Sequence, residues 1–215
     1  MNRIVLNDIA KRYAREWIFR NVNYEFKANE SYVILGSNGS GKSTLLQIIA
    51  SYLIPSKGNI KFYDNDTEIA VEQVYKYFSI ATPYLELPEE FTLLEVIAFH
   101  RKLKAFYGNM SDDAIAERMG LAKAKNKILS QYSSGMKQRV KLGLAILSDT
   151  DLLLIDEPSS NLDAKAIAWF QELINEYRKD RIIIVCSNHI KVEYDFCNHE
   201  IVMEDYKSTK KEVLG

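Results

Sequence analysis

Hydrophobic and polar residues alternate near the start of the chain, whereas later apolar segments are short and uninterrupted. The alternation at 3–9 and 21–26 predicts half-exposed antiparallel strands, so the chain is expected to begin with a small β-layer. The uninterrupted runs at 152–155 and 182–186 are far too short to span a bilayer and are typical of buried parallel strands. Further strands are predicted at 31–35, 60–63 and 77–81.

From Phe91 onward the apolar residues take up a helical spacing. Ser111 is a predicted cap for a helix at 113–119, and we expect a helical insert over residues 86–148. The apolar stripe of its first helix consists of Leu94, Val96, Ile97, Leu103 and Phe106, and the buried face of its last helix is expected to be Met136, Val140, Leu144 and Leu147. Two further helices are predicted at 45–50 and 164–178.

The composition fits one domain in a reducing compartment. With 28 basic and 29 acidic residues the net charge is −1, so binding of nucleic acid through bulk charge is not expected. Cys186 and Cys197 lack the close spacing of a zinc site and the frequency of a disulfide scaffold. Charged residues such as Arg3 and Asp8 near the N-terminus indicate that no signal peptide is present.

A glycine-rich segment at 36–44 has the G-x-x-x-x-G-K-[S/T] pattern of a phosphate-binding loop. It joins a predicted strand to a predicted helix, so backbone N–H groups and the positive end of the helix would face a triphosphate. Lys42 would contact the β- and γ-phosphates. A plain Gly/Ser turn is the alternative, but such a turn does not require Gly-Lys-Ser at a helix start. The predicted nucleotide-binding residues are Gly36, Ser37, Asn38, Gly39, Ser40, Gly41, Lys42, Ser43 and Thr44.

Two carboxylates follow the apolar run 152–155. P-loop enzymes use such a strand end to place one carboxylate near Mg²⁺ and another near the attacking water. We therefore predict Ser43 and Asp156 as Mg²⁺ ligands and Glu157 as the catalytic carboxylate. The alternative is a solvated strand end without a chemical role.

These patterns together predict an α/β fold of the P-loop NTPase class. Its parts would be a mainly parallel core sheet, an N-terminal antiparallel β-layer and an inserted helical subdomain. We expect a single domain, 1–215, with the core formed by 1–85 and 149–215 and the helical subdomain by 86–148.

One histidine and two aromatic residues are further candidates. His189 lies just past the apolar run 182–186, at the sheet edge where ligands gather, whereas His100 and His199 are interpreted as ordinary helix or surface residues. Tyr13 or Trp17 could stack on a nucleotide base. For either aromatic residue taken alone, packing at the sheet edge explains the pattern equally well.

The ordered set of motifs resembles the nucleotide-binding subunit of an ATP-binding cassette (ABC) transporter along essentially the whole chain. Residues 36–44 look like its Walker A loop, 132–136 like its Leu-Ser-Gly-Gly-Gln signature, and 152–157 like Walker B with the catalytic glutamate. Residues 160–163 are similar to its D-loop, His189 to its switch histidine, and Tyr13 to its adenine-stacking aromatic, with Trp17 as the other candidate.

The sequence departs from the pattern of this family at three places. The signature is loose, with Tyr132, Ser134 and Met136 in a form that resembles bacterial exporter-type subunits, but Ser133 and Gly135 are retained. Asn161 stands in the D-loop where a small residue is usual. The loop that normally carries a Mg²⁺- and water-contacting glutamine has none: Pro83 is nearest by alignment, and the candidates to replace the glutamine are Thr82 and Glu86.

The resemblance implies an ATPase that works as a sandwich dimer, with a second copy or a homologous cassette. Each ATP, with its Mg²⁺, would lie between Walker A of one chain and Ser133, Gly135 and Asp163 of the other. Glu157 would polarise the attacking water, and His189 would hold the γ-phosphate. Closure and reopening would drive separate membrane permease subunits, which places the chain in the cytoplasm, peripheral at the inner face of the cell membrane.

Two other functions fit the same motifs. One is a soluble ABC-type ATPase in an assembly or scaffold complex, for example in iron–sulfur cluster biogenesis; the other is a regulatory cassette that binds nucleotide without hydrolysis. Retention of Lys42, Asp156, Glu157 and His189 argues against the regulatory cassette. The transported substrate would be selected by the membrane subunit.

Overall fold

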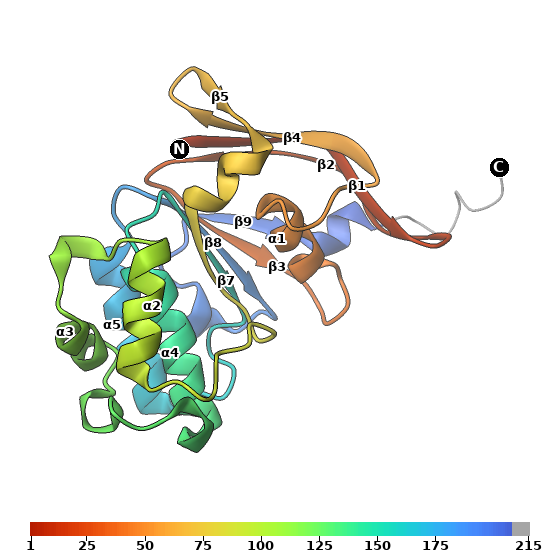
Figure 1. Cartoon of the computed structure of the whole chain (residues 1–215). Coiled ribbons are helices and arrows are strands. Elements are labelled where there is room, and N and C mark those ends of the chain that lie inside the picture. Colours follow the sequence, from red (N-terminus) through yellow and green to blue (C-terminus); the bar gives the residue numbers. More distant parts are fainter. Residues whose placement is uncertain (208–215) are drawn as a thin grey trace.

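The computed structural model describes residues 1–207 and contains two β-sheets with helices packed around them (Figure 1). The antiparallel sheet contains β1 (Arg3–Tyr13), β2 (Glu16–Lys27), β4 (Lys57–Asp64) and β5 (Thr67–Ile69), in the order β2-β1-β4-β5. The parallel sheet contains β3 (Ser31–Leu35), β6 (Phe78–Ala81), β7 (Leu152–Asp156), β8 (Ile182–Ser187) and β9 (His199–Val202), in the order β6-β7-β8-β3-β9. The predicted α/β fold with a parallel core and an antiparallel N-terminal layer is confirmed.

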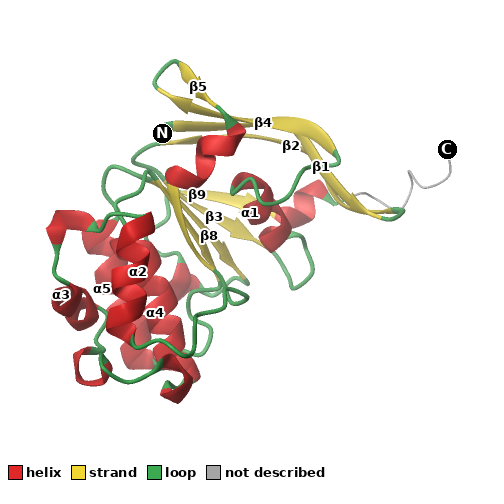
Figure 2. Ribbon diagram, in the orientation of Figure 1, coloured by secondary structure: helices red, strands yellow, loops and turns green. Residues whose placement is uncertain are grey.

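The α-helices lie in two places, as Figure 2 shows. The single helix α1 (Lys42–Ile49) lies between the two sheets, and the others gather at the opposite face of the parallel sheet. This second group contains α2 (Leu93–Leu103), α3 (Asp112–Arg118), α4 (Ser134–Leu147) and α5 (Ala164–Tyr177). Most of the predicted helical insert, 86–148, therefore covers one face of the core sheet.

Side chains of the central strands point alternately into two hydrophobic cores. Leu152 and Leu154 pack with α1 and the antiparallel sheet, whereas Leu153 and Ile155 pack with the helices of the other face. Since successive strand residues point to opposite faces and both faces are covered, every position must be apolar. This explains the uninterrupted apolar runs in the sequence.

Three local features differ from the sequence-based expectations. The strands predicted at 3–9 and 21–26 are longer and join in a hairpin. Irregular register and a positive φ of 50° at Asp8 interrupt the two-residue alternation, so the sequence pattern does not reveal their full length. Strand β9 is not predicted by the sequence pattern, since this short edge strand begins with exposed, polar residues. In α4 the predicted Met136 is only half-buried, whereas the run from Leu142 to Leu147 is enclosed on all sides.

A buried arginine ties the end of α4 to the start of β8. Arg181 is 1% exposed, and its guanidinium donates hydrogen bonds to the carbonyl oxygens of Ile146 and Thr150, both at 3.0 Å, and of Ser148. The ring of Tyr107 lies under the guanidinium, at 5.1 Å. Several acceptors thus compensate for the desolvation of the charge. The contacts join the end of α4 and the segment before β7 to the start of β8.

Lowering the pH from 7 to 5 should destabilise the protein through His100. Its Nε2 lies 2.7 Å from Ser148 Oγ, its ring packs 5.1 Å from that of Phe106, and burial lowers the pKa of the imidazole to about 4. Between pH 6.5, the ordinary pKa of histidine, and about pH 4, His100 binds a proton in the unfolded chain but not in the folded protein. Stability is therefore complete above about pH 6.5 and falls as the pH drops towards 4, by about 2 kcal/mol at pH 5.

Urea unfolding at pH 7 and pH 5 checks this expectation against His100→Gln, in which the side chain stays neutral and can still donate to Ser148. The wild-type protein should lose more stability than the variant over this interval. Equal losses in the two proteins would remove His100 as the cause.

Candidate nucleotide-binding site

The five parallel strands end at one edge of the sheet, and the loops that follow them meet there. The glycine-rich loop follows β3, Asp156 ends β7 and Glu157 follows it, and Asn188 follows β8. Because β8 pairs with β3 on one side and with β7 on the other, the residue after β8 lies between the other two loops. A cleft at this edge is lined by Ile18, Asn38, Gly39, Gly41, Lys42, Ser43, Thr44, Tyr84 and Glu157.

The glycine-rich loop turns tightly into α1 at Gly41. This residue caps the helix with φ 102° and ψ 8°, and a Cβ here would lie 2.7 Å from Ile18 Cγ2 and 2.8 Å from Phe19 Cδ1. Glycine is therefore required both by the backbone conformation and by the close approach of β2. Ser40 is fully buried in the same loop, and its Oγ has no hydrogen-bond partner in the described part of the chain.

The ammonium group of Lys42 lies at the bottom of the loop. The residue is 4% exposed and donates hydrogen bonds to Gly36 O at 2.8 Å, Ser37 O at 3.1 Å and Asn188 Oδ1 at 2.5 Å. It thus brings a positive charge to a cradle of backbone N–H groups. This arrangement suits an anionic group such as a phosphate.

Ser43 and Asp156 meet although 113 positions separate them in the sequence. Burial raises the pKa of the Asp156 carboxyl, and a hydrogen bond with Ser43 acts in the opposite direction. Asp156 is 2% exposed, and its Oδ1 has no hydrogen-bond partner among residues 1–207. A hydroxyl and an unsatisfied carboxylate oxygen beside the phosphate cradle fit Mg²⁺, which binds through few protein oxygens together with the phosphates of a nucleotide.

The backbone of Glu157 turns away from β7 in a left-handed conformation. Its φ is 48°, and its N–H donates to Cys186 O at 3.0 Å. Its Oε1 accepts a hydrogen bond of 2.8 Å from Asn188 Nδ2, and the residue lines the cleft. The carboxylate is thus held beside the ammonium of Lys42 by an amide that contacts both.

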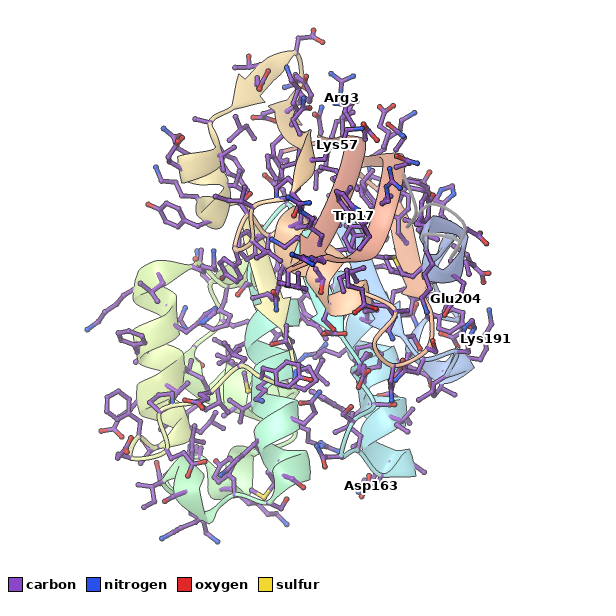
Figure 3. The ribbon with its side chains drawn as sticks, turned by 90° about the vertical axis from the view of Figure 1, so that its right-hand side faces the viewer. Arg3, Trp17, Lys57, Asp163, Lys191 and Glu204 are labelled. Carbon is purple, nitrogen blue, oxygen red and sulfur yellow. The ribbon has the colours of Figure 1, made fainter. Side chains whose placement is uncertain are left out.

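Within residues 1–207, the lining of this cleft does not include His189 or Tyr13. His189 follows Asn188 with φ 63° and is exposed. Tyr13 ends β1 and is 50% exposed, with the ammonium of Lys11 5.3 Å from its ring. Figure 3 shows the other candidate, Trp17, on the same hairpin. Its ring lies under the guanidinium of Arg20, at 5.1 Å, and Ile18 is the hairpin residue that lines the cleft.

A second groove includes one residue of the signature, Ser134, and one of the D-loop, Asn161; it is lined by Pro83, Leu85, Glu86, Leu87, Glu89, Ser134, Lys137, Gln138, Lys141 and Asn161. Ser133 caps α4 by accepting a hydrogen bond from the Met136 N–H at 3.2 Å, and Asp163 caps α5 by accepting one from the Ala166 N–H at 2.7 Å. A Cβ at Gly135 would lie 2.9 Å from Asn161 O, so the two segments touch. Within one chain, therefore, Ser133, Gly135 and Asp163 do not line the cleft that contains Lys42.

The loop at 82–86, which lacks the expected glutamine, contributes a different residue to the lining of the nucleotide cleft. Of the residues between 82 and 86, Tyr84 lines this cleft, whereas Glu86 lines the second groove. Lys141 of α4 donates a hydrogen bond to Pro83 O at 2.8 Å, which fastens the loop to the helix that begins with the signature. The sequence pattern gave no sign of Tyr84 or Lys141.

Two further glutamates support the site and are not evident from the sequence. Glu193 is 1% exposed and accepts hydrogen bonds from the N–H and the hydroxyl of Ser159, at 3.1 and 2.5 Å, and from the hydroxyl of Ser187. It joins the loops that follow β7 and β8. Glu204 lies beside the glycine-rich loop (Figure 3) and accepts hydrogen bonds from the N–H and Oγ of Ser37, at 2.9 and 3.0 Å, which lowers the pKa of its carboxyl.

The sequence pattern of the ABC transporter family matches residues 19–160. Over 209 residues the chain is 31% identical to YybJ of Bacillus subtilis (strain 168), an uncharacterized ABC transporter ATP-binding protein, which covers 93% of this chain and 91% of YybJ. It is 29% identical over 198 residues to BcrA of Bacillus licheniformis, a bacitracin transport ATP-binding protein, covering 89% of this chain and 63% of BcrA. The solved structure of the ATP-binding subunit of an ABC transporter shares the fold, with a TM-score of 0.79 and 24% identity over 93% of this chain and 85% of that one.

The chain therefore belongs to the ABC transporter family. It is an ATP-binding protein of this family and an ABC-type ATPase, as the sequence motifs predict. Within residues 1–207, no helix has the length and apolar character needed to cross a membrane.

Proposed function

We propose that this chain hydrolyses MgATP to power the movement of a substrate through separate membrane subunits. The observation that carries the hydrolytic part is that Lys42, Ser43 and Glu157 line one cleft, while Asp156 forms a hydrogen bond with Ser43. The transport part is supported by relatives such as BcrA, which is a bacitracin transport ATP-binding protein.

The predicted site residues have distinct roles in this proposal. Lys42 and the loop N–H groups hold the β- and γ-phosphates, and Ser43 and Asp156 hold Mg²⁺, which would neutralise charge that develops on the phosphates. Glu157 orients the attacking water and accepts its proton. His189 holds the γ-phosphate. Tyr13 contacts the base, a role supported by the hairpin that also brings Ile18 to the cleft.

The proposal includes a sandwich of two chains. Ser133 and Gly135 do not line the cleft of their own chain, and the second groove beside them is lined by Ser134 and the exposed Asn161. A second copy, or a homologous cassette, would bring these residues and Asp163 against the nucleotide. Residues 86–148 would act as the helical subdomain that carries the signature; the last eight residues of the core part, 149–215, lie outside the described range.

An exposed apolar surface supports a membrane subunit as the partner. Tyr52 and Tyr75 are 65% and 60% exposed, and Leu103 is 68% exposed. They come from three segments that meet around Phe78: its ring lies 5.6 Å from that of Tyr52, and Lys104 contacts both the Phe78 ring and Tyr75 O. We propose that a cytoplasmic segment of the permease covers this surface, which places the chain in the cytoplasm at the inner face of the membrane.

Co-purification of a polytopic membrane protein with the chain tests the transport function. The complex should form in detergent, and addition of the membrane protein should change the MgATPase rate of the chain. Leu103→Glu should weaken this complex at least about tenfold, because a carboxylate would be buried in an apolar contact. The rate of the isolated chain should stay the same.

Ile128→Glu provides the matched control, since Ile128 is also an exposed apolar residue, at 37%, but lies in the connection before α4. It should bind the membrane protein as the wild type does. Co-purification with an assembly-scaffold protein and with no polytopic protein would instead support the alternative of an assembly ATPase and overturn the transport proposal.

A further inference from the structure

Asn188 is the side chain that joins the two charged residues of the cleft. It is the first residue after β8, and it is half-buried between the glycine-rich loop and the end of β7. Its Oδ1 lies 2.5 Å from Lys42 Nζ and its Nδ2 lies 2.8 Å from Glu157 Oε1. An ammonium can only donate and an ionised carboxylate can only accept, so the two neighbours fix which end of the amide faces each of them.

The contacts of Lys42 are complete without a nucleotide. An ammonium has three N–H groups, and Gly36 O, Ser37 O and Asn188 Oδ1 provide three acceptors. A phosphate oxygen that binds Lys42 must therefore displace one of them. The two carbonyls belong to the backbone of the loop, whereas the amide of Asn188 belongs to a side chain that can rotate. Asn188 is thus the contact that yields with the least disturbance of the loop.

The backbone of Glu157 is fixed, and one side-chain contact sets the direction of its carboxylate. The φ of 48° and the hydrogen bond from its N–H to Cys186 O hold the main chain. The amide of Asn188 then holds one carboxylate oxygen. A neutral amide at this place also separates Lys42 from Glu157, two opposite charges that would otherwise attract each other directly.

We propose that Asn188 is a positioning residue: its amide nitrogen directs Glu157 into the cleft, and its amide oxygen gives up Lys42 to the incoming phosphate. Without nucleotide, the amide bridges the ammonium and the carboxylate. When a triphosphate takes its place on Lys42, the amide oxygen is released while the amide nitrogen keeps Glu157 directed into the cleft. The inference rests on the proposed role of Glu157 as the group that activates water.

Steady-state kinetics and nucleotide binding of Asn188→Ala test the proposal. We expect kcat to fall about 10- to 100-fold, because general-base catalysis by an oriented side chain contributes factors of this order or more. The affinity for ATP, titrated with a fluorescent ATP analogue without Mg²⁺, should stay within about twofold of wild type or become tighter, since Lys42 loses a competing acceptor. A residue with a merely structural role would not separate the two quantities in this way.

Two further variants make the test specific. Asn188→Asp keeps an acceptor for Lys42 but cannot donate to an ionised Glu157, so its kcat should be as low as that of Asn188→Ala. In a Glu157→Gln background, Asn188→Ala should change the residual rate by no more than about twofold, because residues that act through one another are not additive. Asn175→Ala, at an exposed asparagine of α5, is the matched control and should behave as wild type.

The possible outcomes separate this inference from the proposed function. A wild-type protein that hydrolyses ATP, a Glu157→Gln protein that does not, and an Asn188→Ala protein with normal kcat would overturn only the inference. Fully additive losses in the double variant would also overturn it. Normal hydrolysis by Glu157→Gln would overturn both. Circular dichroism and the Tm of each variant show whether the fold is retained. If the alanine variant does not fold, the kcat of Asn188→Asp decides whether the inference holds.

Discussion

Replacing Glu157 by glutamine should slow ATP hydrolysis by about 100-fold or more and leave nucleotide binding intact. The amide has nearly the shape of the carboxylate, so the loop after β7 keeps its left-handed turn and its hydrogen bond to Cys186 O. It cannot accept a proton from water, and catalysis loses its base. Because bound ATP is then retained, a dimer held together by two nucleotides should accumulate.

The measurements are phosphate release under saturating MgATP, binding of a fluorescent nucleotide, and size-exclusion chromatography with and without MgATP. Glu172→Gln, at an exposed glutamate of α5, is the control for the loss of one negative charge and should hydrolyse ATP normally. Hydrolysis near the wild-type rate by Glu157→Gln would exclude Glu157 as the base.

Replacing Lys42 by alanine should weaken ATP binding, with Kd rising about 10- to 100-fold. Loss of hydrogen bonds to a charged group typically costs about 1.5–3 kcal/mol, which corresponds to this range. The change removes the positive charge at the bottom of the cradle and also leaves Gly36 O and Ser37 O without their donor. Both effects act on the phosphate-binding loop, and neither affects the hydrophobic cores.

Titration with a fluorescent ATP analogue checks this expectation, and Lys165→Ala on the exposed start of α5 is the charge-matched control. A Tm close to that of the wild type would show that the variant is folded. Unchanged affinity in a folded Lys42→Ala protein would contradict the interpretation of 36–44 as a phosphate cradle.

The central part of the fold could be predicted because its sequence pattern reflects burial directly. The runs at 152–155 and 182–186 are apolar at every position since both faces of the parallel sheet are covered. The ends of parallel strands share one edge, so the meeting of the glycine-rich loop with Asp156 and Glu157 also follows from local patterns. Strand β9 could not be found in this way, because only one of its four residues is fully buried.

The rest of the site depends on contacts between segments that local patterns do not specify. Asn188 gains its place between Lys42 and Glu157 only because β8 lies between β3 and β7, and the order of strands is a property of the whole sheet. The direction of the loop after β6 likewise decides that Tyr84, and neither Thr82 nor Glu86, lines the cleft. Alternating residues alone also do not determine which hairpin residue reaches the cleft, and Ile18, not Tyr13, lines it.

The hydrogen bond from Lys141 to the carbonyl of Pro83 limits how substitutions in this loop affect the structure. Every amino acid provides a carbonyl, including proline, so substitutions in the loop leave this acceptor in place. The tether between the loop and the signature-bearing helix is therefore insensitive to which residue occupies position 83. Position 83 therefore need not be glutamine for this hydrogen bond to form, as long as the lysine is kept.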